Sequence, residues 1–405
     1  MRLYSYLLPQ SVEVVVTGIS LISSLGQNLE TSWKNLILGY VGIEVEQPFP
    51  ELTALPLALI YQQPTDVKQL IQLAVAAALT DAGLEPPLPD CGVVIGSSRS
   101  QQAAWEELIK SKVESQKSKV ASTPDSRTGG FRNPSLPTPE FSDTLPNAIA
   151  TIAARQIGAT GMVSSPMAAC ATGIWAIAQG SLLIATGQCQ RAIVGAVEAP
   201  ITPLTLAGFR QMGALATTGA YPFDRHREGL VLGEGAAVLV LESATAAKQR
   251  SAKIYGRVLS FGLTNDAYHA AQPEPTGKSA IAAIKQCLER GNLTPQDIDY
   301  IHAHGTATQL NDKREAEIIQ YLFGNKIPVS STKGATGHTL GASGAMGAAF
   351  CLSALRHQIL PPCTGLRSPQ FDLDLIVTPR SAAVKHLLCL SFGFGGQNAV
   401  LALGK

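Results

Sequence analysis

The chain contains an internal repeat, and this repeat limits its fold more than any other feature of the sequence. Three pairs of segments match one another in the same order along the two halves. They are 67–95 with 277–302, 164–166 with 330–332, and 235–241 with 397–403. A duplicated unit explains three matches in one order better than chance does. The sequence therefore predicts two similar halves, residues 1–252 and residues 253–405.

Each half alternates strand-like and helix-like segments. Residues 14–18 and 92–95 are β-branched runs that stop at glycine, whereas 67–82 has apolar residues at helical spacing. The continuous apolar run 236–241 is typical of a strand covered on both faces. This alternation predicts an α/β architecture of parallel or mixed sheets covered by helices. In such sheets a site forms beyond the strand ends, where we expect the two halves to face one another.

Charge and cysteine usage argue against several classes of function. The 405 residues carry a formal net charge of +1, which gives no basic excess for nucleic-acid binding. Seven cysteines without paired spacing indicate a reducing compartment and argue against a structural metal. No apolar run reaches membrane-spanning length, and residues 1–8 are too short for a signal peptide. We expect a cytoplasmic protein that binds neither nucleic acid nor a membrane.

The segment 111–139 differs from the rest of the chain in composition. It is rich in Lys, Ser, Thr, Pro and Gly and has few large apolar residues, which predicts a mobile surface excursion rather than a domain. Its basic residues include Lys117, Lys119, Arg127 and Arg132. They could contact an acidic partner, although a solvated loop is the favoured interpretation.

One cysteine, Cys170, stands among small residues in 164–173 and directly before the apolar segment 174–185. This pattern predicts a helix start inside the protein. Unpaired backbone N–H groups and the helix dipole would favour the thiolate there, which is the reactive form. Many buried cysteines only fill space, so a nucleophile needs partners before it can be assigned.

Two histidines are the candidate partners. His304 lies in 302–308, where a predicted strand ends, and His338 lies at the head of a helix rich in Gly and Ala. The predicted cleft between the halves would bring both to Cys170. Metal binding is the competing use, but Cys, His and His without a carboxylate or a second thiolate make a poor zinc set. We therefore expect no metal.

The segment 391–396 (SFGFGG) is a fourth candidate element. Its glycines permit unusual dihedral angles and expose backbone N–H groups that could line an oxyanion hole, while Phe394 could swing. A tight structural turn is the alternative. The segment 391–396 has neither the glycine spacing nor the lysine of a phosphate-binding loop.

Together these motifs resemble the β-ketoacyl-acyl carrier protein synthases of the elongating type I/II group, which are KAS II-like members of the thiolase superfamily. The motifs are 168–173 (AACATG), 304–308 (HGTAT), 333–338 (KGATGH) and 392–396 (FGFGG). Residues 14–18 and 222–235 resemble the family as well. The resemblance covers nearly the whole chain. It implies the thiolase fold, with two similar βαβαβαββ halves in a five-layer α-β-α-β-α arrangement, and a homodimer.

The resemblance also implies an activity, the decarboxylative Claisen condensation that lengthens a fatty acyl chain by two carbons. Cys170 matches the nucleophile that takes the acyl group from acyl carrier protein. His304 and His338 match the pair that promotes decarboxylation of malonyl-acyl carrier protein, and the resulting carbanion equivalent attacks the acyl-Cys carbonyl. Lys333 matches a lysine that supports His338 electrostatically, although a solvated cation is its alternative interpretation.

Further roles follow from the same resemblance. The backbone N–H groups of Cys170 and Phe394 would form the oxyanion hole, and Phe394 matches a gating residue. Thr306 and Thr308 match threonines that hold the phosphopantetheine arm, although local backbone capping is the alternative. No metal or organic cofactor is implied, because the phosphopantetheine arrives on the acyl carrier protein. Glu315 and Glu317, which follow the second motif, are interpreted as structural pairing residues.

The chain departs from the family in three places. Residues 99–102 (RSQQ) replace a glycine-rich segment of the acyl pocket, so no chain-length preference is implied. Among the basic residues that dock the carrier at the helix 67–82, only Lys68 is present. An arginine expected near Gly213 is replaced, with Arg210 slightly earlier. Because charge pairs at such an interface set encounter rate and partner choice, the identity of the carrier stays open.

Three other functions fit parts of the pattern. A condensing enzyme of a specialised lipid or polyketide pathway shares every motif. A non-catalytic partner subunit of the chain-length-factor type shares the fold, but such subunits typically lack the cysteine that Cys170 supplies. A thiolase needs a second catalytic cysteine in a Cys-x-Gly setting, which 389–391 (CLS) does not offer.

Overall fold

The computed structural model describes residues 12–121 and 144–405, with the backbone alone for 114–121. Eleven strands among these residues are hydrogen-bonded in the order β12-β10-β9-β14-β15-β8-β1-β7-β6-β4-β5. In the first half they are β1 (Val14–Ser23), β4 (Gly92–Gly96), β5 (Val163–Ser164), β6 (Arg191–Glu198) and β7 (Gly235–Ser243). In the second half they are β8 (Gly256–Asn265), β9 (Tyr300–His302), β10 (Pro328–Ser330), β12 (Asp374–Leu375), β14 (His386–Gly393) and β15 (Gln397–Gly404).

The two halves of this sheet have the same strand order. The order β5-β4-β6-β7-β1 corresponds to β10-β9-β14-β15-β8, strand by strand. β4 runs parallel to β5 and β6, and β9 runs parallel to β10 and β14. β1 and β8 join the halves through a short antiparallel pairing at Val14 to Val16. The predicted duplication is therefore confirmed, whereas the boundary at residue 252 stays a prediction.

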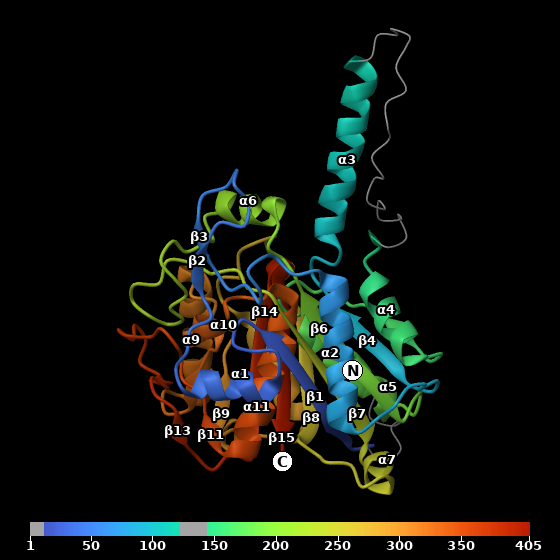
Figure 1. Cartoon of the computed structure of the whole chain (residues 1–405). Helices are drawn as coiled ribbons and strands as arrows, with labels where there is room; N and C mark the ends of the chain where they lie inside the picture. Colours follow the sequence, from blue (N-terminus) through green and yellow to red (C-terminus); the bar gives the residue numbers. More distant parts are fainter. Residues whose placement is uncertain (1–11, 122–143) are drawn as a thin grey trace.

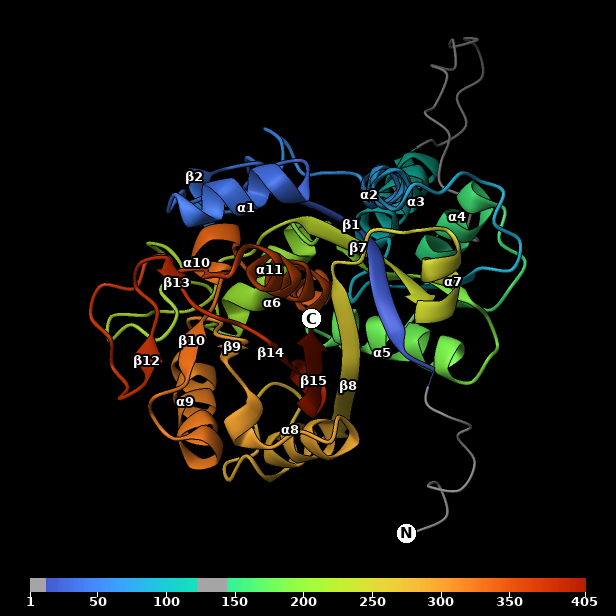
Figure 2. The ribbon, with the colours of Figure 1, turned by 90° about the horizontal axis from the view of Figure 1, so that it is seen from below.

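Helices form three further layers. Helix α5 (Thr172–Ala185) and helix α11 (Ser343–His357) pack against one another between the two half-sheets. Helices α2 (Val67–Ala82) and α4 (Ala148–Ile157) cover the outer face of the first half-sheet. Helices α8 (Lys278–Arg290) and α9 (Gln309–Phe323) cover the other, as Figure 2 shows. This is the predicted five-layer arrangement.

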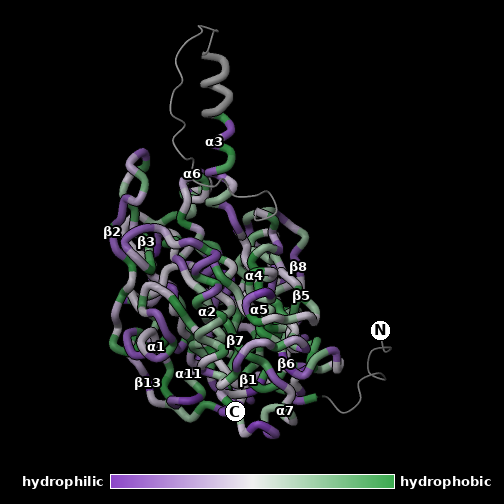
Figure 3. Tube along the Cα trace, turned by 45° about the vertical axis from the view of Figure 1, so that its right-hand side comes forward, coloured by the Kyte–Doolittle hydropathy of each residue, from purple (hydrophilic) through white to green (hydrophobic). Residues whose placement is uncertain are grey.

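Local sequence explains why these helices begin and approach as they do. Asp66 caps α2 by accepting hydrogen bonds from the N–H groups of Lys68 and Gln69, and Gly83 ends the helix in a left-handed conformation. Between the central helices, a Cβ added to Gly173 would lie 2.3 Å from the backbone nitrogen of Ala345. Only glycine fits there, so Gly173 allows α5 and α11, one from each half, to come into close contact. Figure 3 shows the hydrophobic interior that results.

Shorter elements surround the layers. They are α1 (Leu29–Ile37), β2 (Glu44–Glu46), β3 (Leu55–Leu57), α6 (Pro203–Gln211), α7 (Ala244–Gln249), α10 (Lys333–Thr336), β11 (Ile359–Leu360) and β13 (Arg380–Ser381). Within the described ranges, no helix combines the length and apolar character needed to cross a membrane.

Helix α3 (Gln102–Ala121) corrects one prediction. It stands away from the body in Figure 1 and includes residues 111–121, which were expected to form a loop. That expectation is wrong because composition masked helix propensity: the segment contains Glu, Gln, Lys and Ala, with no proline before Pro124. The rest of the excursion, including Arg127 and Arg132, lies outside the described residues.

Candidate active site

Cys170 occupies a tightly held turn just before α5. Ala169, the residue before it, has a φ of +47°, in the left-handed region that non-glycine residues rarely adopt. The Thr172 hydroxyl accepts a hydrogen bond from the N–H of Ala168 at 2.9 Å and donates to the Ala169 carbonyl at 2.6 Å. From β14 of the other half, Ser391 donates to the Cys170 carbonyl at 2.8 Å. Both halves therefore fix the position of the thiol.

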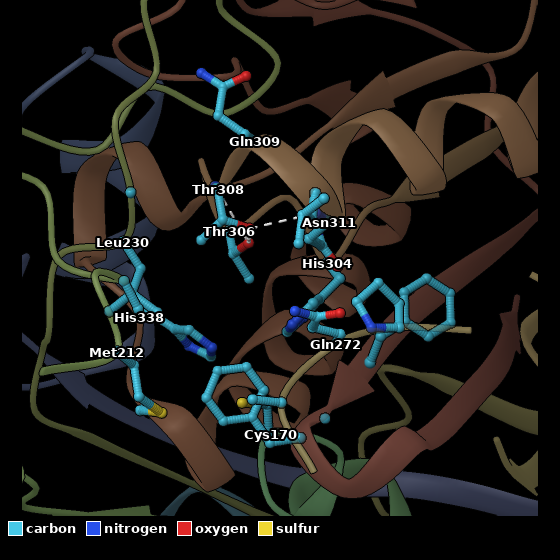
Figure 4. Close-up of a pocket in the computed structure, with 18 of the residues that line it drawn as sticks. Cys170, Met212, Leu230, Gln272, His304, Thr306, Thr308, Gln309, Asn311 and His338 are labelled. Atoms are coloured by element: carbon cyan, nitrogen blue, oxygen red, sulfur yellow. Dashed lines mark hydrogen bonds between the residues drawn. The ribbon is translucent and has the colours of Figure 1, made fainter. Parts of the chain in front are cut away.

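The two predicted histidines lie next to this thiol. The ring centroids of His304 and His338 are 5.3 Å apart, and the rings are nearly perpendicular at 81°. The Cys170 sulfur and one nitrogen from each ring all lie within 4.8 Å of one another, and all three residues are buried. Figure 4 shows them around one opening. The structure thus brings together residues that lie more than 130 positions apart in the chain.

The orientation of His338 depends on residues from outside its own motif. Its N–H donates to the Val231 carbonyl at 2.6 Å, and its carbonyl accepts from the N–H of Gly233 at 3.1 Å. Its Nδ1 lies 2.9 Å from the Ser343 hydroxyl, which leaves Nε2 for the reaction. Sequence reasoning missed Ser343, because a serine five residues after a histidine is not a recognisable signal. The Nδ1 of His304, by contrast, is buried and has no hydrogen-bond partner among the described residues.

Lys333 is buried beside the two histidines, so its interpretation as a solvated cation is wrong. Its ammonium donates to the His304 carbonyl. Burial, and next the positive charge of Lys333, hold the pKa of both imidazoles well below the usual range. Both rings are therefore neutral at physiological pH. A neutral imidazole can donate an N–H or accept a proton, which suits the predicted chemistry.

Glu315 fixes the loop that carries His304. Its two carboxylate oxygens accept hydrogen bonds from the N–H groups of His304 and Gly305, at 2.6 and 2.7 Å. Glu317 pairs with Arg314 at the surface, at 2.6 Å. The predicted pairing roles of both glutamates are confirmed. Glu315 differs from Glu317 because it is fully buried and lies close to Lys333.

The expected thiolate is not what the surroundings of Cys170 favour. Burial raises the pKa of its thiol to about 11, against the lowering effects of Lys333 and of the Phe394 backbone N–H. The effect of lost hydration on the pKa is larger than the lowering effect expected from the helix N-terminus, because the sulfur is buried. Cys170 is a thiol at neutral pH and must lose its proton as it attacks, and the neutral histidines are the nearby bases.

The 391–396 segment approaches Cys170 through its backbone. A Cβ on Gly393 would lie 2.8 Å from the Ala168 carbonyl oxygen and 3.0 Å from the Cys170 nitrogen, so glycine is required. The Phe394 N–H is directed at the Cys170 sulfur. The half-buried Phe394 ring stacks on Phe209, with ring centroids 6.0 Å apart. The segment 391–396 is therefore a tight structural turn and also part of the site.

A cavity of about 410 Å³ leads to Cys170, His304 and His338. Thr306 and Thr308 lie on its wall with their hydroxyls 2.9 Å apart (Figure 4). Thr308 also caps α9 by accepting from the N–H of Asn311 at 3.4 Å, so the capping interpretation holds for this residue too. No sequence pattern singled out the other lining residues, which include Met212, Gln272, Gln309 and Asn398.

A second group of metal-ligand types lies outside the cavity. The ligand atoms of His302, Cys351 and Cys389 lie within 4.8 Å of one another, as do those of the Cys170 group. Neither group includes a carboxylate, and the expectation of no metal stays a prediction. Among the described residues, Cys170 is the one cysteine that lines the cavity. Cys389 therefore does not supply a second thiol there, as a thiolase would require.

Comparison with known proteins places the chain in a family. Residues 62–247 match the model "Beta-ketoacyl synthase, N-terminal domain", and residues 255–367 match "Beta-ketoacyl synthase, C-terminal domain". The chain belongs to the β-ketoacyl synthase family. It is similar to the proteins named 3-oxoacyl-[acyl-carrier-protein] synthase 2 from Mycobacterium bovis, at 33% identity over 97% of both chains, and from Staphylococcus aureus, at 31% identity over 98% of this chain and 99% of the relative.

Solved structures agree with this assignment. One neighbour is a type II PKS acyl-carrier protein in complex with its ketosynthase bound to the hexaketide, with a TM-score of 0.87, 28% identity and coverage of 98% of this chain and 100% of the other. Another is a β-ketoacyl synthase from Burkholderia phymatum, with a TM-score of 0.84, 27% identity and coverage of 97% and 99%. The thiolase fold and the class of condensing enzyme are therefore established for this chain.

Proposed function

We propose that the chain is a β-ketoacyl-acyl carrier protein synthase that joins an acyl group held on Cys170 to malonyl-acyl carrier protein. One observation carries the proposal: a buried cysteine and two neutral histidines meet at the end of one cavity. The relatives named 3-oxoacyl-[acyl-carrier-protein] synthase 2 support it. The product is a β-ketoacyl chain two carbons longer than the acyl group supplied.

In the first half-reaction, the Cys170 sulfur attacks the thioester carbonyl of acyl-carrier protein. The thiol proton passes to a neutral imidazole and then to the departing phosphopantetheine sulfur. The N–H groups of Cys170 and Phe394 stabilise the negative charge that develops on the carbonyl oxygen. Thr306 and Thr308 hold the arm along the cavity wall, and Phe394 moves to admit the acyl chain.

In the second half-reaction, malonyl-acyl carrier protein occupies the same cavity. Its C–C bond to the carboxylate breaks and carbon dioxide leaves. The electron pair forms an enolate whose oxygen accepts hydrogen bonds from His304 and His338. The enolate carbon then attacks the acyl-Cys170 carbonyl, and the Cys170 sulfur departs with the bonding pair and takes up a proton from water, which restores the thiol. Burial, and next the positive charge of Lys333, keep both imidazoles neutral, so that they donate hydrogen bonds without first binding a proton.

The proposed partners are acyl carrier protein and a second copy of the chain. The carrier supplies the phosphopantetheine, and no metal or organic cofactor takes part. For the homodimer, Val163 of the edge strand β5 is exposed, and so are Met162 just before it and Met167 just after it, which is the kind of apolar edge a partner covers. All seven cysteines are free, which fits the reducing cytoplasm as the location.

The test is intact-protein mass spectrometry after incubation with acyl-acyl carrier proteins of several chain lengths. We expect an added acyl mass on the native chain and none on Cys170→Ala. Malonyl-acyl carrier protein should then release carbon dioxide and the β-ketoacyl product. If no donor forms an acyl adduct and no primer leads to release of carbon dioxide, the enzyme proposal is refuted and a non-catalytic partner subunit is favoured.

A further inference from the structure

Three buried side chains of the second half form a group that the proposed reaction does not use. His302 ends β9, Cys351 lies in α11 and Cys389 lies in β14. Each is 2% exposed or less. One ring nitrogen and the two sulfurs all lie within 4.8 Å of one another. The three residues come from separate elements, so no spacing pattern in the sequence could have indicated the group.

The imidazole of His302 is oriented toward the sulfurs by a residue outside the group. Its Nε2 lies 3.2 Å from the Thr332 hydroxyl, and its Nδ1 lies 3.9 Å from the Cys389 sulfur. When Nε2–H donates to Thr332, Nδ1 keeps its lone pair and directs it at Cys389. A histidine that binds a metal is usually held in this way, through a hydrogen bond from its other ring nitrogen.

The spacing of these atoms is close to that of ligands that share one ion. Metal bonds of about 2.3 Å to sulfur and about 2.0 Å to nitrogen place the two ligand atoms about 3.6–3.8 Å apart. The observed separation of the Cys389 sulfur and the His302 Nδ1 is 3.9 Å. A Cβ on Gly347 of α11 would lie 2.9 Å from this sulfur and 3.1 Å from this nitrogen. A larger residue there would cover both atoms, whereas glycine leaves them uncovered on the α11 side.

The charges around the group favour a thiolate and therefore a cation. The Cys351 thiol donates a hydrogen bond to Cys389 and lowers the pKa of its sulfur, against the effect of burial. Lys333 is close enough for its positive charge to act on Cys389 as well. The expectation of no metal was argued for the group at Cys170, which supplies one thiol. The present group supplies two, and soft thiolate ligands are those that select soft metal ions.

We propose that the Nδ1 of His302 and the sulfurs of Cys351 and Cys389 bind one Cu(I) ion, which takes no part in the condensation. Thiolate and imidazole ligands suit both Cu(I) and Zn(II), but structural zinc sites are almost always four-coordinate. Among the residues that the structure describes, this group offers three ligand side chains, a number that satisfies Cu(I). Binding breaks two S–H bonds, forms two Cu–S bonds and one Cu–N bond, and releases two protons to water. The bound site carries a net charge of −1, opposite to that of Lys333.

The experiment is an anaerobic competition for Cu(I) with the coloured chelator bicinchoninate, in ascorbate and without added thiols. Cys170→Ala is the parent chain, because it lacks the nucleophile of the other group of ligand types. We expect it to withdraw one equivalent of Cu(I). Thr332→Val removes only the partner of the His302 ring and should weaken binding about 10–100-fold, and Cys351→Ser and Cys389→Ser should weaken it further. Cys287→Ser, buried in α8, is the matched control and should bind like the parent.

A second measurement decides the matter even where a serine variant does not fold, which thermal unfolding reveals. X-ray absorption at the copper edge of the loaded parent chain should show two sulfurs and one nitrogen around the ion. Any other set of ligands would overturn the inference, because the ion would then lie elsewhere on the chain. So would a parent chain that withdraws no Cu(I), or folded Cys351→Ser and Cys389→Ser variants that bind it as tightly as the parent.

Discussion

Two turns at equivalent places in the two halves are held in the same way and have different tasks. After β4, Glu198 accepts hydrogen bonds from the N–H groups of residues 98 and 99. After β9, Glu315 accepts from those of residues 304 and 305. Burial raises the pKa of each carboxyl to about 7. Both glutamates are buried anchors, each of which reaches its turn from another element.

The difference lies in how completely each anchor is used. Glu315 uses both oxygens, one for each N–H, and lies near the buried Lys333. Glu198 uses one oxygen for both N–H groups and leaves the other unpaired. The second-half turn therefore rests on two carboxylate oxygens, one for each N–H group, whereas the first-half turn rests on one. The two halves therefore share a turn held by a buried glutamate, but only the turn of the second half carries a histidine of the site.

The largest expected effect separates the two anchors by stability. Glu315→Ala leaves two buried N–H groups unpaired and removes the carboxylate whose charge acts most strongly on the buried Lys333, so we expect a loss of about 3–5 kcal/mol in the free energy of unfolding. Among the described residues, Glu198 has no buried lysine beside it, so Glu198→Ala should lower the free energy of unfolding by only about 1–3 kcal/mol. Urea unfolding measures both. Glu317→Ala is the control, because its exposed pair with Arg314 is worth about 0–1 kcal/mol. Equal losses at Glu198 and Glu315 would contradict the comparison.

The second prediction concerns the opposite effects of Lys333 and Glu198 on the pKa of the nucleophile. Burial raises the pKa of Cys170, Lys333 lowers it, and Glu198 raises it further. Lys333→Met should therefore shift the pH profile of Cys170 alkylation to higher pH, and Glu198→Gln should shift it to lower pH. Iodoacetamide labelling followed by intact mass, with Cys170→Ala as the blank, gives both profiles. Shifts in the same direction would show that the two charges do not act as the geometry requires.

The sequence predicts the fold and the centre of the site for identifiable reasons. The duplication is visible because strand and helix patterns recur in order, and Cys170, His304 and His338 stand out because each lies in small residues at a junction. The pKa of Cys170 and the role of Glu198 could not be predicted in this way. Both depend on contacts across a hundred or more positions, which only folding creates. Helix α3 was missed because residues 111–121 share their composition with the proline-containing segment that follows.

The third prediction is a pH dependence of stability that arises from Glu198. Burial raises the pKa of its carboxyl to about 7, above its ordinary value, so the folded state favours the protonated form. This contribution is present at low pH and is lost as the pH rises from the unfolded value through about 7, by up to about 1.4 kcal/mol per pH unit. Glu198→Gln removes it. The difference in unfolding free energy between native chain and variant should therefore change across this window, and a constant difference would contradict the assignment.

The smallest expected effect concerns Ser343, which positions the Nδ1 of His338 from the start of α11. Ser343→Ala leaves His338 in place, because its backbone still bonds Val231 and Gly233, but frees its ring. Loss of one hydrogen bond of about 1 kcal/mol should lower carbon dioxide release about fivefold, with little change in acyl transfer to Cys170. Ser181→Ala on the paired helix α5 is the control, since among the residues that the structure describes that hydroxyl bonds only the Ile177 carbonyl of its own helix. A fall in both half-reactions, or an equal fall for Ser181→Ala, would show that Ser343 supports packing and does not orient the imidazole.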